Sequence, residues 1–344
     1  MARYSNTART DNYEMITQTV VDALQAVVDG TATRLPWQRD WRTLGVPRNG
    51  FSGRAYSGVN VILTAMQPFE DPRWATSNQI MQHCGFQRSK GRGARWAYKG
   101  EGQVPTERIL NGTPTTIVFW KFIQTEVKAT DGTVERNADG SPKMKTIPLL
   151  RTFRVYNFEQ VNWPQGCEPP AIDGADLAVD PAEVYAEAEA EAVFAAYIES
   201  QGLPVEHKGS RAYYSVTDDK VVLPKAKRFL SAQGYQRVKA HELVHSTGAA
   251  GRLNRNIRNV FGTPDYAREE LVAELGAAFL CSDLGINNEG DLDDNHKAYL
   301  LNWIKRLSDN KYEIFTAARL AREAVALIKG QAAADETDEV EEAA

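Results

Sequence analysis

The segment HELVHSTG, residues 241–248, limits the possible fold of this 344-residue chain more than any other stretch. His241 and His245 are four residues apart, so on an α-helix both imidazoles project from one face and can reach one ion. Glu242 between them lies near enough to touch a metal-bound water without being a ligand. The segment therefore predicts a helix that carries a metal centre and needs a second helix to bring another ligand. Two histidines on a solvated or core helix are the alternative.

Residues 266–284 contain the candidates for that further ligand, since Glu269, Glu270 and Glu274 follow His245 by 24 to 29 positions. At about 100° per residue, one side of the expected helix holds carboxylates among small side chains, which let two helices approach closely. That side consists of Glu270, Glu274, Ala277, Ala278 and Cys281.

We expect Glu274, at the centre of the small side chains, to be the third metal ligand. Glu270, one turn earlier, is expected to hydrogen-bond a ligand histidine, or to be the ligand in place of Glu274. Glu269 is expected on a solvated helix face. The expected metal is Zn²⁺, with Mn²⁺ and Co²⁺ as alternatives.

The HExxH arrangement predicts a metallopeptidase. Zinc lowers the pKa of its bound water to about 7, Glu242 acts as general base, and the water attacks a peptide carbonyl. An extended substrate usually pairs with an exposed strand edge, for which RAYYSV, residues 211–216, is the candidate. Tyr213 or Tyr214 could donate to the developing oxyanion, or both could pack in a sheet. The histidines at 207 and 296 are interpreted as ordinary polar positions.

Composition and charge divide the chain into two halves. Residues 1–170 hold 21 Lys and Arg against 15 Asp and Glu, a net charge of +6, whereas residues 171–344 hold 19 against 30, a net charge of −11. Six of the seven tryptophans precede residue 170. Different partners are therefore expected for the two halves.

The chain shows no sign of a membrane or secretory protein. No apolar run approaches the roughly 20 residues that span a bilayer, and the amino terminus lacks a signal peptide. Three widely spaced cysteines without a CxxC pair argue against a disulfide framework and a cysteine zinc site. We expect a cytoplasmic protein with reduced thiols and no membrane partner.

Patterning predicts an α+β fold with two domains. Residues 10–29 have the apolar spacing of an amphipathic helix, and 115–122 and 147–158 are expected strands joined by a long polar connection. The Pro- and Gly-rich stretch after Trp163 predicts a boundary. The expected division is a DNA-binding domain at 1–165, a linker at 166–182, a metallopeptidase domain at 183–330 and an acidic disordered tail at 331–344.

The first half interleaves cations with aromatic side chains, a composition typical of single-stranded nucleic acid binding, although tryptophans are more often core residues. No sequence-reading motif is present, so binding without sequence specificity is expected. The candidate contacts are Trp37, Arg39, Trp41, Arg54, Tyr56, Trp74, Arg92, Arg95 and Trp96.

Several segments together resemble the ArdC-type antirestriction proteins of conjugative plasmids. They are LPWQRDW, GRAYSGVNVILT, RSKGRGARWAYKG, RTFRVYNFEQV, YYSVTDDKVVLP, HELVHSTG and YAREELVAELGAAFL, and they extend from about Thr10 to about Lys329. The resemblance implies an amino-terminal domain that binds single-stranded DNA, shared with TraC-type plasmid primases, and a zincin-like metallopeptidase domain. His241, Glu242 and His245 match the family motif, and EELVAEL matches the downstream acidic ligand.

What the resemblance implies is a protein that shields incoming plasmid DNA from host restriction. The protein substrate of the peptidase is not identified by the sequence. A DNA-binding antirestriction factor whose metal site is structural remains the alternative, and a toxin-like protease whose first half recognises a protein is a third reading.

Overall fold

In the computed structural model the amino-terminal helix packs against elements of the second half of the chain. The structure describes residues 11–37, 47–89, 95–100, 108–129, 132–171, 183–229, 231–257, 263–286 and 294–332. Helix α1 (Asn12–Val28) starts where the side chain of Asp11 accepts a hydrogen bond from the backbone of Tyr13 at 2.9 Å. Its apolar stripe, predicted from the spacing, is buried and packs on α7 (Asp294–Asp309) and on other parts of the core.

A four-stranded sheet lies beside α1, with strand order β1-β2-β6-β5. The two predicted strands are present as β5 and β6, and they pair antiparallel over the whole of β5. Two short strands earlier in the chain, which the sequence did not indicate, complete the sheet. The strands are β1 (Arg48–Asn49), β2 (Arg73–Thr76), β5 (Thr115–Glu126) and β6 (Met144–Asn157), with helices α2 (Val59–Ala65) and α3 (Ser77–His83) between them.

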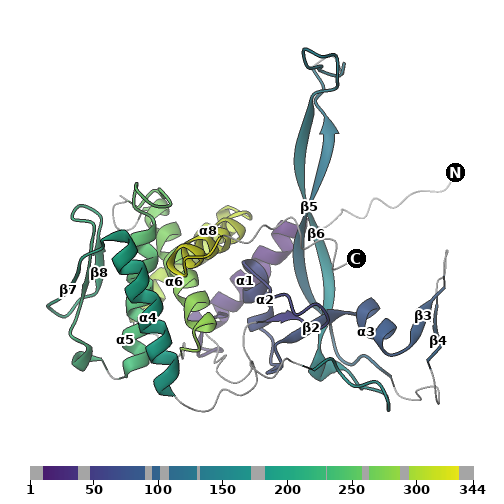
Figure 1. Ribbon diagram of the computed structural model, residues 1–344, viewed down its shortest axis with the longest axis horizontal. Coiled ribbons are helices and arrows are strands. Elements are labelled where there is room, and N and C mark those ends of the chain that lie inside the picture. The colour runs from purple at the N-terminus through teal and green to yellow at the C-terminus, as the bar shows by residue number, and fades with distance from the viewer. Residues whose placement is uncertain are drawn as a thin grey trace.

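The outer part of the β5–β6 hairpin extends away from the rest of the molecule, and a second, smaller hairpin lies beyond α3 (Figure 1). The smaller hairpin pairs β3 (Phe86–Arg88) with β4 (Trp96–Tyr98). The base of the long hairpin is held on one side by Trp120, whose ring contacts Tyr13 of α1 and Phe315.

The second half places a helical layer against a small three-stranded sheet of order β7-β9-β8. The strand β8 is therefore at an edge, as the sequence predicted for RAYYSV. The elements are α4 (Glu183–Gln201), β7 (Val205–His207), β8 (Tyr213–Ser215), β9 (Lys220–Leu223), α5 (Ala232–Thr247), α6 (Pro264–Asp283), α7 and α8 (Glu313–Ile328). Short 3₁₀ turns lie at Phe158–Gln160 and Ala226–Arg228.

The largest buried cluster contains residues from both halves, from Val20 and Trp37 to Leu271 and Trp303. Most of the expected linker at 166–182 and most of the expected acidic tail at 331–344 lie outside the described residues. Within the described part of the chain, no helix is long and apolar enough to cross a bilayer.

Candidate metal centre

Helix α5 carries the HELVHSTG segment, as the sequence predicted. The side chain of Ser231 caps its start by accepting from the backbone N–H of Gly234 at 3.0 Å. The helix ends at Gly248, where a Cβ atom would lie only 2.6 Å from the side chain of Ile257. Leu243 and Val244 are fully buried, so the opposite face of the helix, with the two histidines, is directed to the site.

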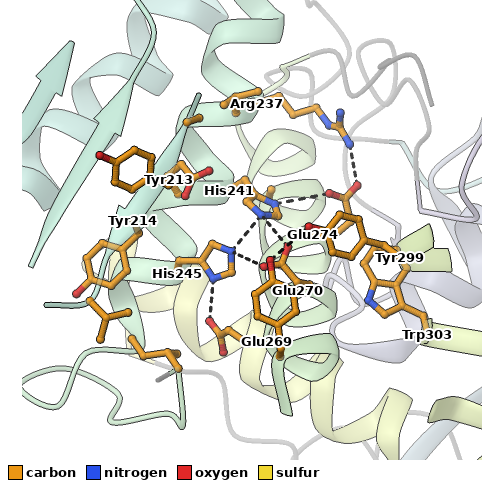
Figure 2. A pocket seen from close by; sticks show the side chains of 17 residues that line it. Tyr213, Tyr214, Arg237, His241, His245, Glu269, Glu270, Glu274, Tyr299 and Trp303 are labelled. Carbon is orange, nitrogen blue, oxygen red and sulfur yellow. Dashed lines mark hydrogen bonds and ion pairs between the residues drawn. The ribbon is translucent and has the colours of Figure 1, made fainter. Parts of the chain in front are cut away.

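Helix α6 packs against α5 at a point of unusually close approach. A Cβ atom on Gly276 would lie 2.9 Å from the side chain of Val244. Small residues on this side of α6 were predicted from the sequence, and Ala277 and Ala278 are indeed buried. This contact brings the glutamates of α6 within reach of the histidines of α5, as Figure 2 shows.

His241, His245 and Glu270 offer three donor atoms that lie within 4.8 Å of one another. The two Nε2 atoms are 3.1 Å apart, and each lies 3.7 Å from a carboxylate oxygen of Glu270. Nitrogen and carboxylate donors at this spacing match the donor set of a zinc-type ion, whose ligand bonds are about 2.0 to 2.2 Å long. The residues present therefore fit a divalent cation.

A buried ion pair fixes the orientation of His245. Its Nδ1 lies 3.1 Å from Glu269, and both oxygens of Glu269 accept hydrogen bonds from Arg255, at 2.7 and 3.0 Å. The Nδ1 atom is thereby directed to the carboxylate, which leaves Nε2 for a metal. The expectation that Glu269 lies on a solvated face was wrong, because only 7% of this residue is exposed. Neither Glu269 nor Arg255 had a sequence signal that pointed to this role.

Glu274 occupies a different position from the one expected. Its carboxylate lies 3.7 Å from Nδ1 of His241, on the ring nitrogen away from His245, and it accepts from Arg237 at 2.7 Å. The geometry thus favours Glu270, the alternative, over Glu274 as the third donor. Periodicity could not separate the two glutamates, because they are four residues apart on the same helix face.

Burial and neighbouring charges act in opposite directions on the pKa values of His241, Glu270 and Glu242. Burial acts to lower the pKa of His241, but hydrogen bonds to Glu270 and Glu274 outweigh it and raise the pKa to about 10. Burial acts to raise the pKa of Glu270, and the two histidines outweigh it and hold the pKa at about 2. Burial raises the pKa of the Glu242 carboxyl, while the nearby histidines act against this rise. Glu242 is thus the acid of this group whose proton affinity is increased.

The site opens into a cavity of about 540 Å³ between β8 on one side and α6 and α7 on the other (Figure 2). Tyr213 of β8 is 43% exposed and lines the cavity. The Tyr214 hydroxyl instead donates to Asp219 at 2.7 Å, and its backbone hydrogen-bonds Glu242. The far wall holds Tyr266, Tyr299 and Trp303. Tyr213 is therefore the better placed of the two tyrosines to meet a substrate.

The candidate DNA contacts are scattered by the fold. Trp37, Tyr56 and Trp74 are core residues, 2%, 6% and 1% exposed, so their rings cannot stack on bases. Arg54 is half-buried, and the β3–β4 hairpin holds an exposed Arg95 and a half-buried Trp96. Candidates at positions Arg39, Trp41 and Arg92 lie outside the described residues.

Comparison with known protein families separates the chain into two matched regions. A family described as the N-terminal domain of anti-restriction factor ArdC matches residues 10–156. A family described as zincin-like metallopeptidase matches residues 188–320. The second match includes the whole of α5 and α6, which carry the histidines and the glutamates.

Curated relatives include longer proteins. Two DNA primases TraC of Escherichia coli are 31% identical over 318 residues, which cover 89% of this chain but only 19% and 26% of the primases. An uncharacterised protein y4eC of Sinorhizobium fredii is 29% identical, with 97% of each chain covered. The chain thus spans about a quarter or less of the primases that it matches.

Solved structures match almost the whole chain. The metal-free crystal structure of the antirestriction protein ArdC from plasmid R388 is 26% identical with a TM-score of 0.62, and the match covers 93% of this chain and 97% of that one. The Mn(II)-bound structure of the same protein is 29% identical over the same shares, with a TM-score of 0.60. The chain therefore belongs to the ArdC antirestriction family, in which an ArdC-type N-terminal domain is followed by a zincin-like metallopeptidase domain.

Proposed function

We propose that this protein protects incoming plasmid DNA from restriction, that its first half binds single-stranded DNA without sequence specificity, and that its second half hydrolyses peptide bonds at a divalent metal centre. The observation that supports the enzymatic part best is the convergence of His241, His245 and Glu270 beside a buried Glu242. The Mn(II) bound in the related ArdC structure supports a divalent cation at this centre, with Zn²⁺ as an alternative.

In this proposal His241, His245 and Glu270 hold the cation, while Glu274 and Glu269 orient the histidines from their Nδ1 sides. A divalent ion bound there would polarise a carbonyl and lower the pKa of water. Glu242 accepts the proton and returns it to the leaving amine, a role that suits a carboxyl whose pKa is raised by burial. Tyr213 is the candidate donor to the developing oxyanion.

An extended peptide is proposed to bind along the free edge of β8. It is an outer strand of its sheet, and the backbone of Tyr214 already hydrogen-bonds Glu242. A peptide added along this edge would place its backbone beside the general base. The aromatic wall at Tyr299 and Trp303 would contact its side chains.

The test compares Glu242→Gln with Glu189→Gln, the same chemical change at an exposed position of α4. Metal content, hydrolysis of fluorescently labelled casein and plasmid protection are measured on each full-length variant. We expect Glu242→Gln to retain metal and lose both hydrolysis and protection, and Glu189→Gln to behave as wild type. Full hydrolysis by Glu242→Gln would contradict the assignment.

A second candidate function is DNA binding with a structural metal site. The ion pairs Arg255–Glu269 and Arg237–Glu274 favour it, because they would support the fold around an ion whether or not catalysis occurs. If Glu242→Gln protects plasmid DNA as well as wild type, this second function is the correct one.

A further inference from the structure

The β5–β6 hairpin exposes an unusual share of apolar surface. Five large apolar side chains of this hairpin are between 38% and 47% exposed. They are Phe122, Ile123, Met144, Ile147 and Leu149. Within the described residues, only three other large apolar side chains are exposed to this degree, and they lie apart on β8, α7 and the start of α8. Exposed apolar side chains that gather on one element are typical of an interaction surface.

The pairing register assigns part of this cluster to one face. Ile123 lies opposite Ile147, and Lys121 lies opposite Leu149. The neighbouring pairs on the same face are Thr125 with Lys145 and Phe119 with Arg151, because side chains alternate between faces along a strand. We call Lys121, Ile123, Thr125, Lys145, Ile147, Leu149 and Arg151 the cationic face.

The charges on the cationic face are all positive. Lys121, Lys145 and Arg151 are exposed, and none forms an ion pair with another described residue. The nearest strand acid, Glu126, pairs with Met144 and so belongs to the opposite face. By contrast, Lys143 nearer the tip is bound to Glu135 at 3.1 Å. The cationic face thus suits a partner with regularly spaced negative charges.

The base of the hairpin holds the cationic face in place. Phe119, on the same face, is buried against Tyr56 and Phe153, in a cluster that also contains Trp74. Tyr56 and Trp74 were expected to stack on bases, and they instead support the strands that present the cations. Trp120 anchors the opposite face on Tyr13 and Phe315, so the cationic face remains open.

We propose that single-stranded DNA lies along the cationic face of the β5–β6 hairpin. Lys121, Lys145 and Arg151 contact phosphates, and Ile123, Ile147 and Leu149 pack against sugars and bases. Successive positions on one face of a strand are about 6.8 Å apart, so Lys121 lies about one such step from Arg151 and Lys145 two further steps toward the tip. An extended single strand that runs along the hairpin can pass all three cations. This inference rests on the proposed DNA-binding function and gives it a location.

The experiment measures binding of a labelled oligothymidine to the full-length chain from low to moderate salt. The first variant combines Lys121→Gln, Lys145→Gln and Arg151→Gln. Its matched control removes three exposed lysines from the second half, Lys225→Gln, Lys227→Gln and Lys305→Gln. Each lost phosphate contact on a single strand should reduce the slope of log affinity against log salt by about 0.7, so the hairpin variant should lose about 2. The control should keep the wild-type slope.

A second variant, Ile147→Ser with Leu149→Ser, separates the apolar contribution. It should weaken binding without changing the salt slope, since no phosphate contact is lost. Circular dichroism and thermal unfolding check that both hairpin variants are folded, which is expected because the changed side chains are exposed.

The outcomes distinguish this inference from the proposed function. If wild type binds and both hairpin variants bind equally well, DNA lies elsewhere and the inference is wrong, while the proposed function stands. If wild type itself does not bind oligothymidine, the proposed DNA-binding function fails. If wild type self-associates and the serine variant is monomeric with unchanged DNA affinity, the face is a contact between copies, and the inference is again wrong.

Discussion

The metal centre and the cationic face use positive charge in opposite ways. At the centre, Arg237 and Arg255 are 13% and 4% exposed, and each is bound to a glutamate that orients a histidine. On the hairpin, Lys121, Lys145 and Arg151 point to solvent and have no acidic partner among the described residues. One region has charges that are already neutralised by the fold, and the other keeps its charges available to a partner.

The two arrangements of charge suit the two regions to different tasks. A buried pair is screened little by salt and holds side chains within the tolerance that a catalytic centre needs. Exposed cations act over about 10 Å at 0.1 M salt and attract a polyanion without fixing its sequence.

The largest effect is expected at the general base. Glu242→Gln should lower the rate of casein hydrolysis roughly 100-fold to 10,000-fold, because the amide cannot accept the proton. Oligothymidine affinity should stay at the wild-type value, since Glu242 is buried in the other region of the molecule. A parallel loss of both activities would indicate that the two regions are not separable.

The two glutamates of α6 should differ in their effect on metal affinity. Glu270→Ala removes a proposed ligand and should lower affinity more than 100-fold, whereas Glu274→Ala removes a hydrogen-bond partner and should lower it about 10-fold to 100-fold. Titration with a chromophoric chelator measures both, with Glu189→Ala as the control. The reverse order would restore Glu274 as the ligand expected from the sequence.

Substitution of Glu313 measures how much a buried cluster of ion pairs contributes to the stability of the second half. Its carboxylate is 1% exposed and lies 2.5 Å from Arg268 and 2.6 Å from Arg306. Glu313→Gln should lower the free energy of unfolding by about 3 kcal/mol, since two guanidinium groups lose their shared partner. Glu323→Gln, in a partly exposed pair with Arg319 on the same helix, should change it by less than about 1 kcal/mol. Urea unfolding measures both.

The same cluster gives a pH dependence with a defined sign. Burial would raise the pKa of Glu313, but the two arginines outweigh it and hold the pKa below its ordinary value of 4.5. The stabilisation is therefore complete above the unfolded pKa and is lost as the pH falls through the folded pKa. The difference in unfolding free energy between wild type and Glu313→Gln should shrink below pH 4.5. A constant difference down to the acid transition would contradict this account.

The smallest effect concerns salt. Raising monovalent salt from 50 to 200 mM should weaken oligothymidine binding roughly 20-fold if three phosphates are contacted. Casein hydrolysis should change less than about twofold, because the charges at the centre are buried and paired. Equal salt sensitivity of the two activities would remove the contrast between the regions.

The sequence alone predicted the helix with His241 and His245, the small-residue side of α6 and the strand at Tyr213, because these depend on local periodicity. It also predicted the β5–β6 strands, and the resemblance to ArdC-type proteins was confirmed by the family matches. It did not indicate β1 and β2, since strands of two to four residues are too short to show an alternation of apolar and polar side chains. The three cysteines are free, as the sequence predicted, but only the tertiary structure brings the thiols of Cys84 and Cys167 within 2.9 Å of each other.

Local spacing determined which residues share a helix face and which segments form strands, since both are properties of a few consecutive residues. Only the tertiary structure decided that Glu270 faces the two histidines, that Glu269 is buried against Arg255, and that Trp74 supports a hairpin instead of stacking on DNA. Those outcomes depend on how closely α5 and α6 approach and on which surfaces the core covers. Contacts between residues far apart in the sequence set both, and no local pattern records them.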